Sequence, residues 1–261
     1  MLETTIYEMK KSWKRDTAIG VAMGLMGALM VGIYPSFESS MDLTELINSM
    51  PEAMQSVFGA ASVNSLEGFL ALEMYGIFWL ALLGAYFAYR GGGLISGEIE
   101  SGKIDNTLVM PVTRTKFILE KYLSLITPII TLNLAVILFE IGTAAVMGLE
   151  LSIQNLLLTH LLSVPYFFAC GATGLLFSTL LERESSGRRI SAGLMFGLFM
   201  VEKVTKGTDF EAISVISPTK YYEASNTLIE GSVNLANTGL LIGSTVLFLL
   251  VSVMIFRQRD L

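Results

Sequence analysis

Residues 236–256 read ANTGLLIGSTVLFLLVSVMIF, and the basic residue Arg257 follows directly. These 21 positions contain no Asp, Glu, Lys or Arg. A helix rises about 1.5 Å per residue, so about 20 apolar residues cross the roughly 30 Å hydrocarbon core of a bilayer. The stretch therefore predicts a transmembrane helix that ends at a basic residue close to the membrane surface.

The same apolar character extends over the whole chain. Hydrophobic residues make up 52% of the 261 residues and the mean hydropathy is +0.62, as expected of a protein whose solvent is lipid. We expect an all-α integral membrane protein in which residues 1–261 form a single transmembrane domain, with no room for a soluble catalytic domain. Apolar stretches predict six transmembrane helices, at about residues 17–36, 69–90, 118–147, 154–181, 190–206 and 236–256.

Basic residues predict the orientation of these helices, because Lys and Arg gather on the cytoplasmic side of membrane proteins. Basic clusters precede the first span and follow the second, fourth and sixth, which all fall on one face when six spans are drawn. Only Lys203, Lys206 and Lys220 break the pattern. We therefore expect a multi-pass protein of the cell membrane with both termini in the cytoplasm. The clusters are Lys10, Lys11, Lys14 and Arg15; Arg90, Lys103, Arg114, Lys116 and Lys121; Arg183, Arg188 and Arg189; and Arg257 and Arg259.

Residues 1–16 combine an apolar stripe with basic residues. Leu2, Ile6, Met9 and Trp13 recur at spacings of three and four, with Lys and Arg between them. This pattern predicts an amphipathic interfacial helix that lies among the headgroups of membrane lipids. A segment that only anchors the topology is an equally open alternative.

Small residues recur at four-residue intervals in three of the predicted spans, of which the sixth contains Gly239 and Gly243. Such stripes allow helices to approach closely in lipid, where packing replaces the hydrophobic effect as the driving force. They predict either packing within the subunit, which we favour for any single pair, or an interface with a second subunit. The residues are Gly20, Gly24, Ala28 and Gly32 in the first span, and Gly193 and Gly197 in the fifth.

The polar segment after the second span reads GGGLISGEIESGKIDNTLVMPVTRTKFILEKYL over residues 91–123. Gly97, Gly102 and Lys103 match part of a phosphate-binding loop. Ile104, however, stands where that loop needs the Ser or Thr that holds magnesium. We therefore expect no nucleotide site in this segment.

A short polar helix is the interpretation that we prefer for this segment. The triple glycine is expected to loosen the end of the second span, and residues 98–110 are expected to form a helix that Pro111 ends. A charged helix held at the membrane surface could dock a cytoplasmic partner. A solvated loop that only supplies basic charge for membrane topology is the alternative.

The run Glu98-x-Glu100-Ser101-Gly102 is followed by Leu108, by Pro111-Val112-x-Arg114 and by Lys121. This order is similar to the cytoplasmic segment of type-2 ABC transporter permeases, and the six-span layout resembles theirs as well. The resemblance implies that residues 91–115 form a coupling segment that docks on a separate ABC ATPase subunit. Lys103 and Ile104 depart from the family pattern, which often has a threonine and an apolar residue there. The implied coupling residues are Glu98, Glu100, Gly102, Leu108, Pro111 and Arg114.

The resemblance also implies the partners of the chain. A second permease copy, identical or different, would complete a dimer, and ATP and magnesium would bind to the partner ATPase, with no cofactor bound by this chain. Residues 1–16 would correspond to the family's connecting helix, and residues 207–234 to an extracellular re-entrant segment. Family substrates range from drugs and peptides to lipids and polysaccharides, and some members serve the maturation of copper enzymes. The resemblance therefore does not name a cargo.

Ionisable residues inside predicted spans mark a pathway, a partner or a span end. Glu140 could line a cavity or reach the outer membrane surface, whereas we expect Glu73 to reach that surface. His160 is the only histidine, so we expect a hydrogen-bonded structural role and no metal site. Cys170 lies in an apolar stretch, as expected of a packing cysteine.

The function that we prefer from the sequence is the permease subunit of an ATP-driven exporter, which is not itself an enzyme. A secondary transporter is an alternative, although no clear inverted repeat supports one. An intramembrane enzyme is another, although the chain contains neither H-E-x-x-H nor G-x-S-x-G and offers no catalytic residues. A membrane receptor or immunity protein would be a third class. Nothing in the composition suggests a nucleic-acid partner.

Overall fold

The computed structural model describes residues 3–40, 65–104 and 113–259. Over these ranges every regular element is a helix and no strand is present. Five helical stretches are long and apolar enough to cross a membrane, which confirms a multi-helix membrane fold. They are Glu3–Phe37, Leu66–Gly92, Arg114–Met147, Ile153–Leu180 and Leu235–Gln258.

The first span belongs to a single helix, α1 (Glu3–Ser40). The sequence analysis divided this region into an interfacial helix over residues 1–16 and a span over residues 17–36. That division does not appear, because no proline precedes residue 35 and the helix continues through Gly20. Ile6 and Trp13 are nevertheless 48% and 52% exposed, so the apolar stripe predicted for the start of the chain is available to lipid.

The second span consists of three helical segments joined end to end: α4 (Leu66–Leu70), η1 (Ala71–Leu83) and α5 (Gly84–Gly92). The middle segment has π-helical hydrogen bonding, with wider turns than an α-helix. Long π-helical segments are rare, and shorter ones often occur at functional sites. Tyr75 and Trp79 of η1 are fully buried, so these wider turns place two large aromatic side chains in the core.

The third span bends between α8 (Arg114–Leu123) and α9 (Ile126–Met147). Pro128 lies in the first turn of α9, where its missing N–H leaves no helical hydrogen bond unmade. The fourth span is α10 (Ile153–Leu180), which continues through Pro165.

The fifth span predicted from the sequence, over residues 190–206, corresponds to α11 (Glu184–Thr205). Its 22 residues are enough to cross a bilayer, yet it is not among the five stretches that are sufficiently apolar. Arg188 and Arg189 lie near one end, and Glu202 and Lys203 lie near the other. These charges shorten its apolar part, so the described residues support five spans and leave the sixth as a proposal.

The region predicted as re-entrant, residues 207–234, contains three short helices. They are η2 (Glu211–Ile216), η3 (Pro218–Tyr221) and α12 (Ala224–Glu230). They pack against α10, α11 and η1, and the last long helix, α13 (Leu235–Gln258), follows.

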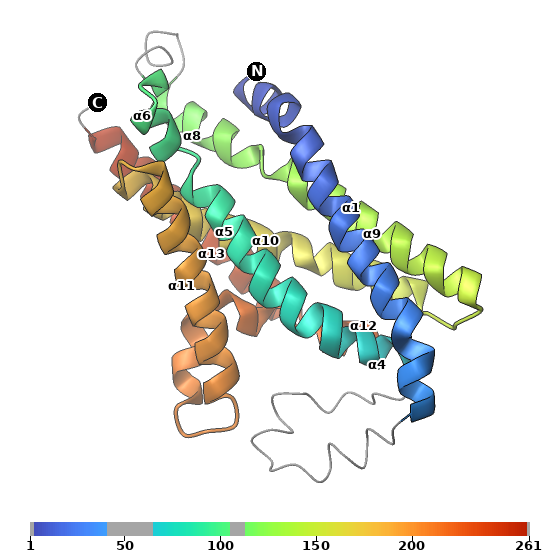
Figure 1. The fold of residues 1–261 in the computed structure, drawn as a ribbon. Helices are drawn as coiled ribbons and strands as arrows, with labels where there is room; N and C mark the ends of the chain where they lie inside the picture. The colour runs from blue at the N-terminus through green and yellow to red at the C-terminus, as the bar shows by residue number, and fades with distance from the viewer. Residues whose placement is uncertain (1–2, 41–64, 105–112, 260–261) are drawn as a thin grey trace.

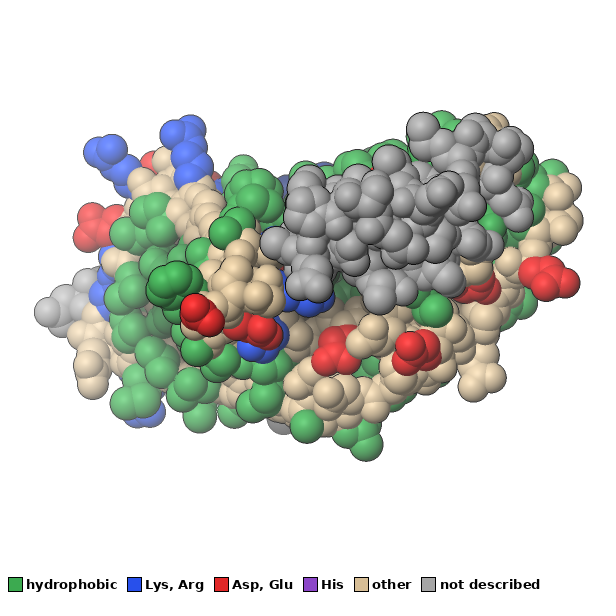
Figure 2. Space-filling model, turned by 90° about the horizontal axis from the view of Figure 1, so that it is seen from below, with side chains coloured by type: hydrophobic (Ala, Val, Ile, Leu, Met, Phe, Trp, Pro, Cys, Tyr) green, Lys and Arg blue, Asp and Glu red, His purple; other side chains and the backbone are tan. Residues whose placement is uncertain are grey.

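Helix α10 lies at the centre of the arrangement, in contact with α5, α11, α12 and α13, while α1 packs along α9 (Figure 1). Both ends of the chain lie at the same end of the bundle as α6 (Ser96–Glu100). We call this the basic end, because Arg90, Lys121 and Arg188 lie there. Large hydrophobic side chains on the long helices are exposed, such as those of Leu138, Leu161 and Met254, as expected of helices that face lipid or other subunits. On the face seen in Figure 2, hydrophobic side chains gather at the left.

Candidate functional site

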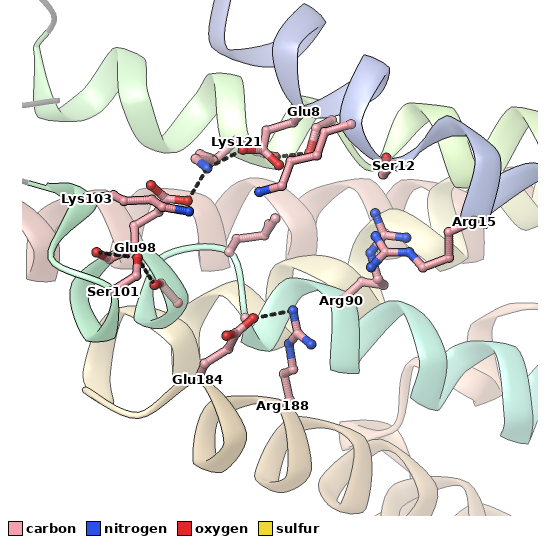
Figure 3. Close-up of a pocket in the computed structure, with 15 residues that line it drawn as sticks. Glu8, Ser12, Arg15, Arg90, Glu98, Ser101, Lys103, Lys121, Glu184 and Arg188 are labelled. Atoms are coloured by element: carbon pink, nitrogen blue, oxygen red, sulfur yellow. Dashed lines mark hydrogen bonds and ion pairs between the residues drawn. The ribbon is translucent and has the colours of Figure 1, made fainter. Parts of the chain in front are cut away.

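The predicted coupling segment begins at the basic end, where α5 turns into α6 (Figure 3). A polar pocket of about 420 Å³ opens there between α1, α8, the α5–α6 turn and α11. At least four of its charged side chains, those of Glu8, Arg90, Glu98 and Lys121, form ion pairs across elements that are distant in the sequence. The charged residues that line it are Glu8, Lys11, Arg15, Arg90, Glu98, Lys103, Lys121, Glu184 and Arg188.

Lys121 of α8 joins three elements at this pocket. Its Nζ donates to Glu8 Oε1 of α1 at 2.7 Å and to Glu98 Oε1 of α6 at 2.8 Å. The Lys121 side chain is only 5% exposed and the two carboxylates are 18% and 16% exposed. Solvent screens such pairs less than it screens surface pairs, so this trio is a strong link between α6 and the rest of the bundle.

Glu100 links α6 to α11. Its Oε2 accepts a hydrogen bond of 2.7 Å from the backbone N–H of Glu184, the first residue of α11. The first N–H groups of a helix have no partner within the helix and carry partial positive charge, so a carboxylate there is favourable. Within the first turn of α11, Glu184 pairs with Arg188.

Ser178 of α10 holds the turn that precedes α6. Its Oγ accepts hydrogen bonds of 2.9 Å from the backbone N–H groups of both Ile95 and Ser96. Ser96 Oγ donates in turn to the carbonyl of Gly92. Ser178 and Ser96 are fully buried, so these bonds are protected from water and fix the turn on α10.

Glycines bring α5 into direct backbone contact with α10 and α11. A side chain on Gly91 would collide with the backbone of Gly171, and one on Gly174 would collide with Ala88. Gly92 and Gly187 face each other in the same way. The triple glycine was expected to loosen the end of the second span, and this expectation is wrong. The first two glycines belong to α5 and allow its close packing.

Asp16 and Arg90 form a further pair that the sequence analysis missed. Asp16 is buried in α1, and Arg90 near the end of α5 donates to it and to the hydroxyl of Tyr86. The sequence shows an acidic residue just before the predicted first span and a basic residue at the end of the second. Their opposite charges were the only signal available.

The predicted coupling residues have different surroundings. Glu98, Glu100 and Gly102 lie at the pocket or beside it, whereas Leu108 and Pro111 fall outside the described residues. Arg114 does not approach the pocket. It donates to the carbonyls of Phe256 and Arg259, at 3.1 and 2.6 Å, and so caps the end of α13.

The helix expected over residues 98–110 differs from the one observed. Helix α6 covers Ser96–Glu100, and Gly102 has a φ of 65°, a left-handed conformation that interrupts a helix. The described part of this segment therefore consists of the short helix α6, a turn at Ser101 and Gly102, and two further helical residues, Lys103 and Ile104, while residues 105–112 lie outside the described ranges.

The predicted small-residue stripes divide into two groups. Gly20 and Gly24 pack against α9, close to the backbone of Thr131 and the ring of Phe139, and Ala28 is half-buried on the same helix. A side chain on Gly32, Gly193 or Gly197 would instead meet open space. The first stripe thus serves contact within the chain over part of its length, and the α11 glycines remain available to lipid or another subunit.

Glu140, predicted as a possible cavity residue, is fully buried between α9, α1 and η1 and does not line the polar pocket. In the described part of the chain, no group of three or more His, Cys, Asp or Glu residues could hold a metal ion. The contacts around the pocket connect several helices, so a movement of one of these helices would be transmitted to the others.

Comparison with known proteins agrees with this architecture. A family model described as ABC-2 family transporter protein matches residues 8–261. The chain belongs to this family. No curated protein matches it significantly. The family match runs from the first turns of α1 to the end of the chain, and so includes the α5–α6 turn and every described span. As an ABC-2 protein, the chain is a membrane subunit of an ABC transporter, and the family implies an ABC ATPase as its partner in general.

Proposed function

We propose that the chain is the permease of an exporter, and that the α5–α6 turn transmits movement from a separate ABC ATPase. In this proposal ATP and magnesium bind to the ATPase, this chain binds no cofactor, and the basic end faces the cytoplasm of the cell. The distribution of Lys and Arg supports that orientation, because both chain ends, α6 and α8 lie at the basic end.

The observation that carries the proposal is the set of links around α6. Lys121 ties Glu98 to α8 and α1, Glu100 holds the start of α11, and Ser178 holds the preceding turn on α10. A displacement of α6 would therefore act on four helices at once, α1, α8, α10 and α11. Packed interfaces of this kind change between discrete arrangements, which is what alternating access requires.

A second permease copy is part of the proposal. The α11 glycines Gly193 and Gly197 have open space beside them, and Leu194 and Phe196 on this helix are exposed. A close contact between two α11 helices would use this small-residue surface. On this arrangement α11 crosses the membrane as the fifth span of the chain and brings the total to six. Burial against its counterpart would reduce its need for an apolar surface.

Reconstitution tests the proposal directly. The permease and its ABC ATPase, reconstituted together in lipid vesicles, should move substrate only when both proteins and ATP are present. Transport by the permease alone, driven by a proton or sodium gradient, would favour a secondary transporter instead.

A further inference from the structure

Glu140 lies in the interior of the helix bundle without any basic partner. Its side chain is 0% exposed, and on the α1 side it occupies the space that a side chain at Gly27 would need. Oε1 makes no hydrogen bond. In the described part of the chain, no Lys or Arg forms an ion pair with this carboxyl group. A buried carboxylate without a counter-charge is strongly disfavoured, so its protonation state needs an explanation.

A chain of hydrogen bonds connects Glu140 to two other spans. Glu140 Oε2 lies 2.9 Å from the hydroxyl of Tyr75 in η1, and this hydroxyl lies 2.8 Å from His160 Nε2 in α10. On the far side of the ring, His160 Nδ1 lies 2.7 Å from Asn133 Oδ1, back in α9. All four side chains are buried.

The direction of this chain follows from Asn133. Its Nδ2 donates to the carbonyl of Ile129 at 2.8 Å, so its Oδ1 faces the histidine. The reverse orientation would place two acceptors against each other. Because Oδ1 can only accept, His160 Nδ1 must carry a hydrogen and donate it.

Two distributions of protons then satisfy the remaining contacts. In the first, His160 is neutral, Nε2 accepts from the Tyr75 hydroxyl, and Glu140 is a carboxylic acid that donates to the tyrosine oxygen. In the second, His160 is an imidazolium that donates to Tyr75, and Tyr75 donates to a Glu140 carboxylate. Both contain the same number of protons and have zero net charge.

The geometry favours the neutral chain. In the described part of the chain, Glu140 Oε1 has no hydrogen-bond donor and the carboxyl group has no Lys or Arg partner to stabilise a negative charge. The ion pair would also bury two charges away from water, and it would leave one carboxylate oxygen with no partner at all.

The described groups around Glu140, Tyr75 and His160 supply no charge that would favour the ion pair over the neutral chain. Trp79 of η1 lies edge-on to the imidazole, with ring centroids 4.9 Å apart. Tyr222, which follows η3, donates to the carbonyl of Thr159 next to the histidine. Helix α1 contributes Gly27. The groups near the chain that can ionise are therefore tyrosines, apart from Glu140 and His160 themselves.

We propose that Glu140, Tyr75 and His160 form a proton-binding site that joins α9, η1 and α10, with one proton held on Glu140 in this conformation. Loss of that proton leaves an isolated buried carboxylate and removes the donor to Tyr75. The contact between the three spans is therefore stable when the proton is bound and weaker when the proton is lost. This inference does not depend on the identity of the transported substrate.

The single histidine allows a test on the unaltered protein. Purified without a histidine tag and labelled with ¹⁵N-histidine, the protein in lipid should give one pair of ring ¹⁵N signals. We expect a protonated Nδ1 and an unprotonated Nε2 at neutral pH. Two protonated ring nitrogens, or a proton on Nε2 alone, would overturn the proposal.

Two variants separate the neutral chain from the ion pair. Glu140→Gln keeps a donor to Tyr75, so the His160 signals should stay unchanged, and an infrared band of a protonated carboxyl group should disappear. If Glu140 were the counter-charge of an imidazolium, the same variant would shift the histidine signals and remove a carboxylate band. Tyr75→Phe should shift Nε2 alone, since it removes the donor to that nitrogen.

Discussion

Glu98 of α6 and Lys121 of α8 form an ion pair, with Oε1 and Nζ 2.8 Å apart and both side chains largely buried. The lysine also binds Glu8 of α1. One cation thus connects the predicted coupling segment to two long helices. The proposed function depends on this connection between α6, α8 and α1.

Replacing Lys121 with Met should destabilise the basic end by about 1–3 kcal/mol, between the values for surface and fully buried pairs, because two carboxylates lose their cation. Thermal unfolding in detergent measures the effect. Lys116→Gln is the matched control on the same helix. Its side chain is 45% exposed and lies 3.6 Å from Glu120, so its effect should stay below about 0.5 kcal/mol. Equal effects of the two substitutions would count against a buried link.

Glu100→Lys should reduce substrate transport and ATPase stimulation while leaving membrane insertion intact. The substitution removes the carboxylate that accepts from the α11 N-terminus and places a cation beside the positive end of that helix. Glu100→Gln keeps an acceptor oxygen and should retain most activity. If the lysine variant transports normally, the link from α6 to α11 has no part in coupling.

Gly174→Ala should destabilise the protein by about 1–3 kcal/mol, since the added methyl group would collide with the backbone of Ala88 and Gly92. Gly142→Ala in α9 has open space and should be neutral or slightly stabilising, because alanine is the better helix former. The unfolding midpoints of both variants measure the difference. A tolerated alanine at Gly174 would mean that α5 and α10 are further apart than described.

Gly197→Cys should form a disulfide-linked pair of permeases in membranes under mild oxidation, if two identical copies meet through α11. Cys170 is buried and should not contribute. Gly142→Cys, on the exposed part of α9, provides the control. Crosslinking at both sites to the same extent would indicate random collision and remove support for an α11 interface.

The sequence predicted the helical membrane class and the approximate positions of five spans, because an uninterrupted run of about 20 apolar residues is typical of a transmembrane helix. It was less informative where charge and hydropathy conflict. Helix α11 was predicted, but Arg188 and Glu202 near its ends leave its role as a span open. The continuity of α1 could not be predicted either. An amphipathic pattern shows which face of a helix is apolar, but it does not show at which residue the helix ends.

Individual residues of the site were easier to predict than their contacts. Glu98 and Lys121 both appeared in the family-like motif, yet nothing in their spacing showed that they touch. Gly91 and Gly174 meet across two helices, so a pattern within one helix could not reveal them. Glu140 and His160 were each considered alone, and Tyr75, which connects them, gave no sequence signal.

Site-specific crosslinking from α6 tests the central claim most directly. Ser101→Cys, exposed beside α6, would carry a photoreactive maleimide in membranes that contain the ABC ATPase, with Thr208→Cys beyond the opposite end of α11 as the control. We predict a covalent adduct with the ATPase from residue 101 and none from residue 208. An adduct from residue 208 alone, or labelling of residue 101 only by a reagent added outside the cell, would contradict the account.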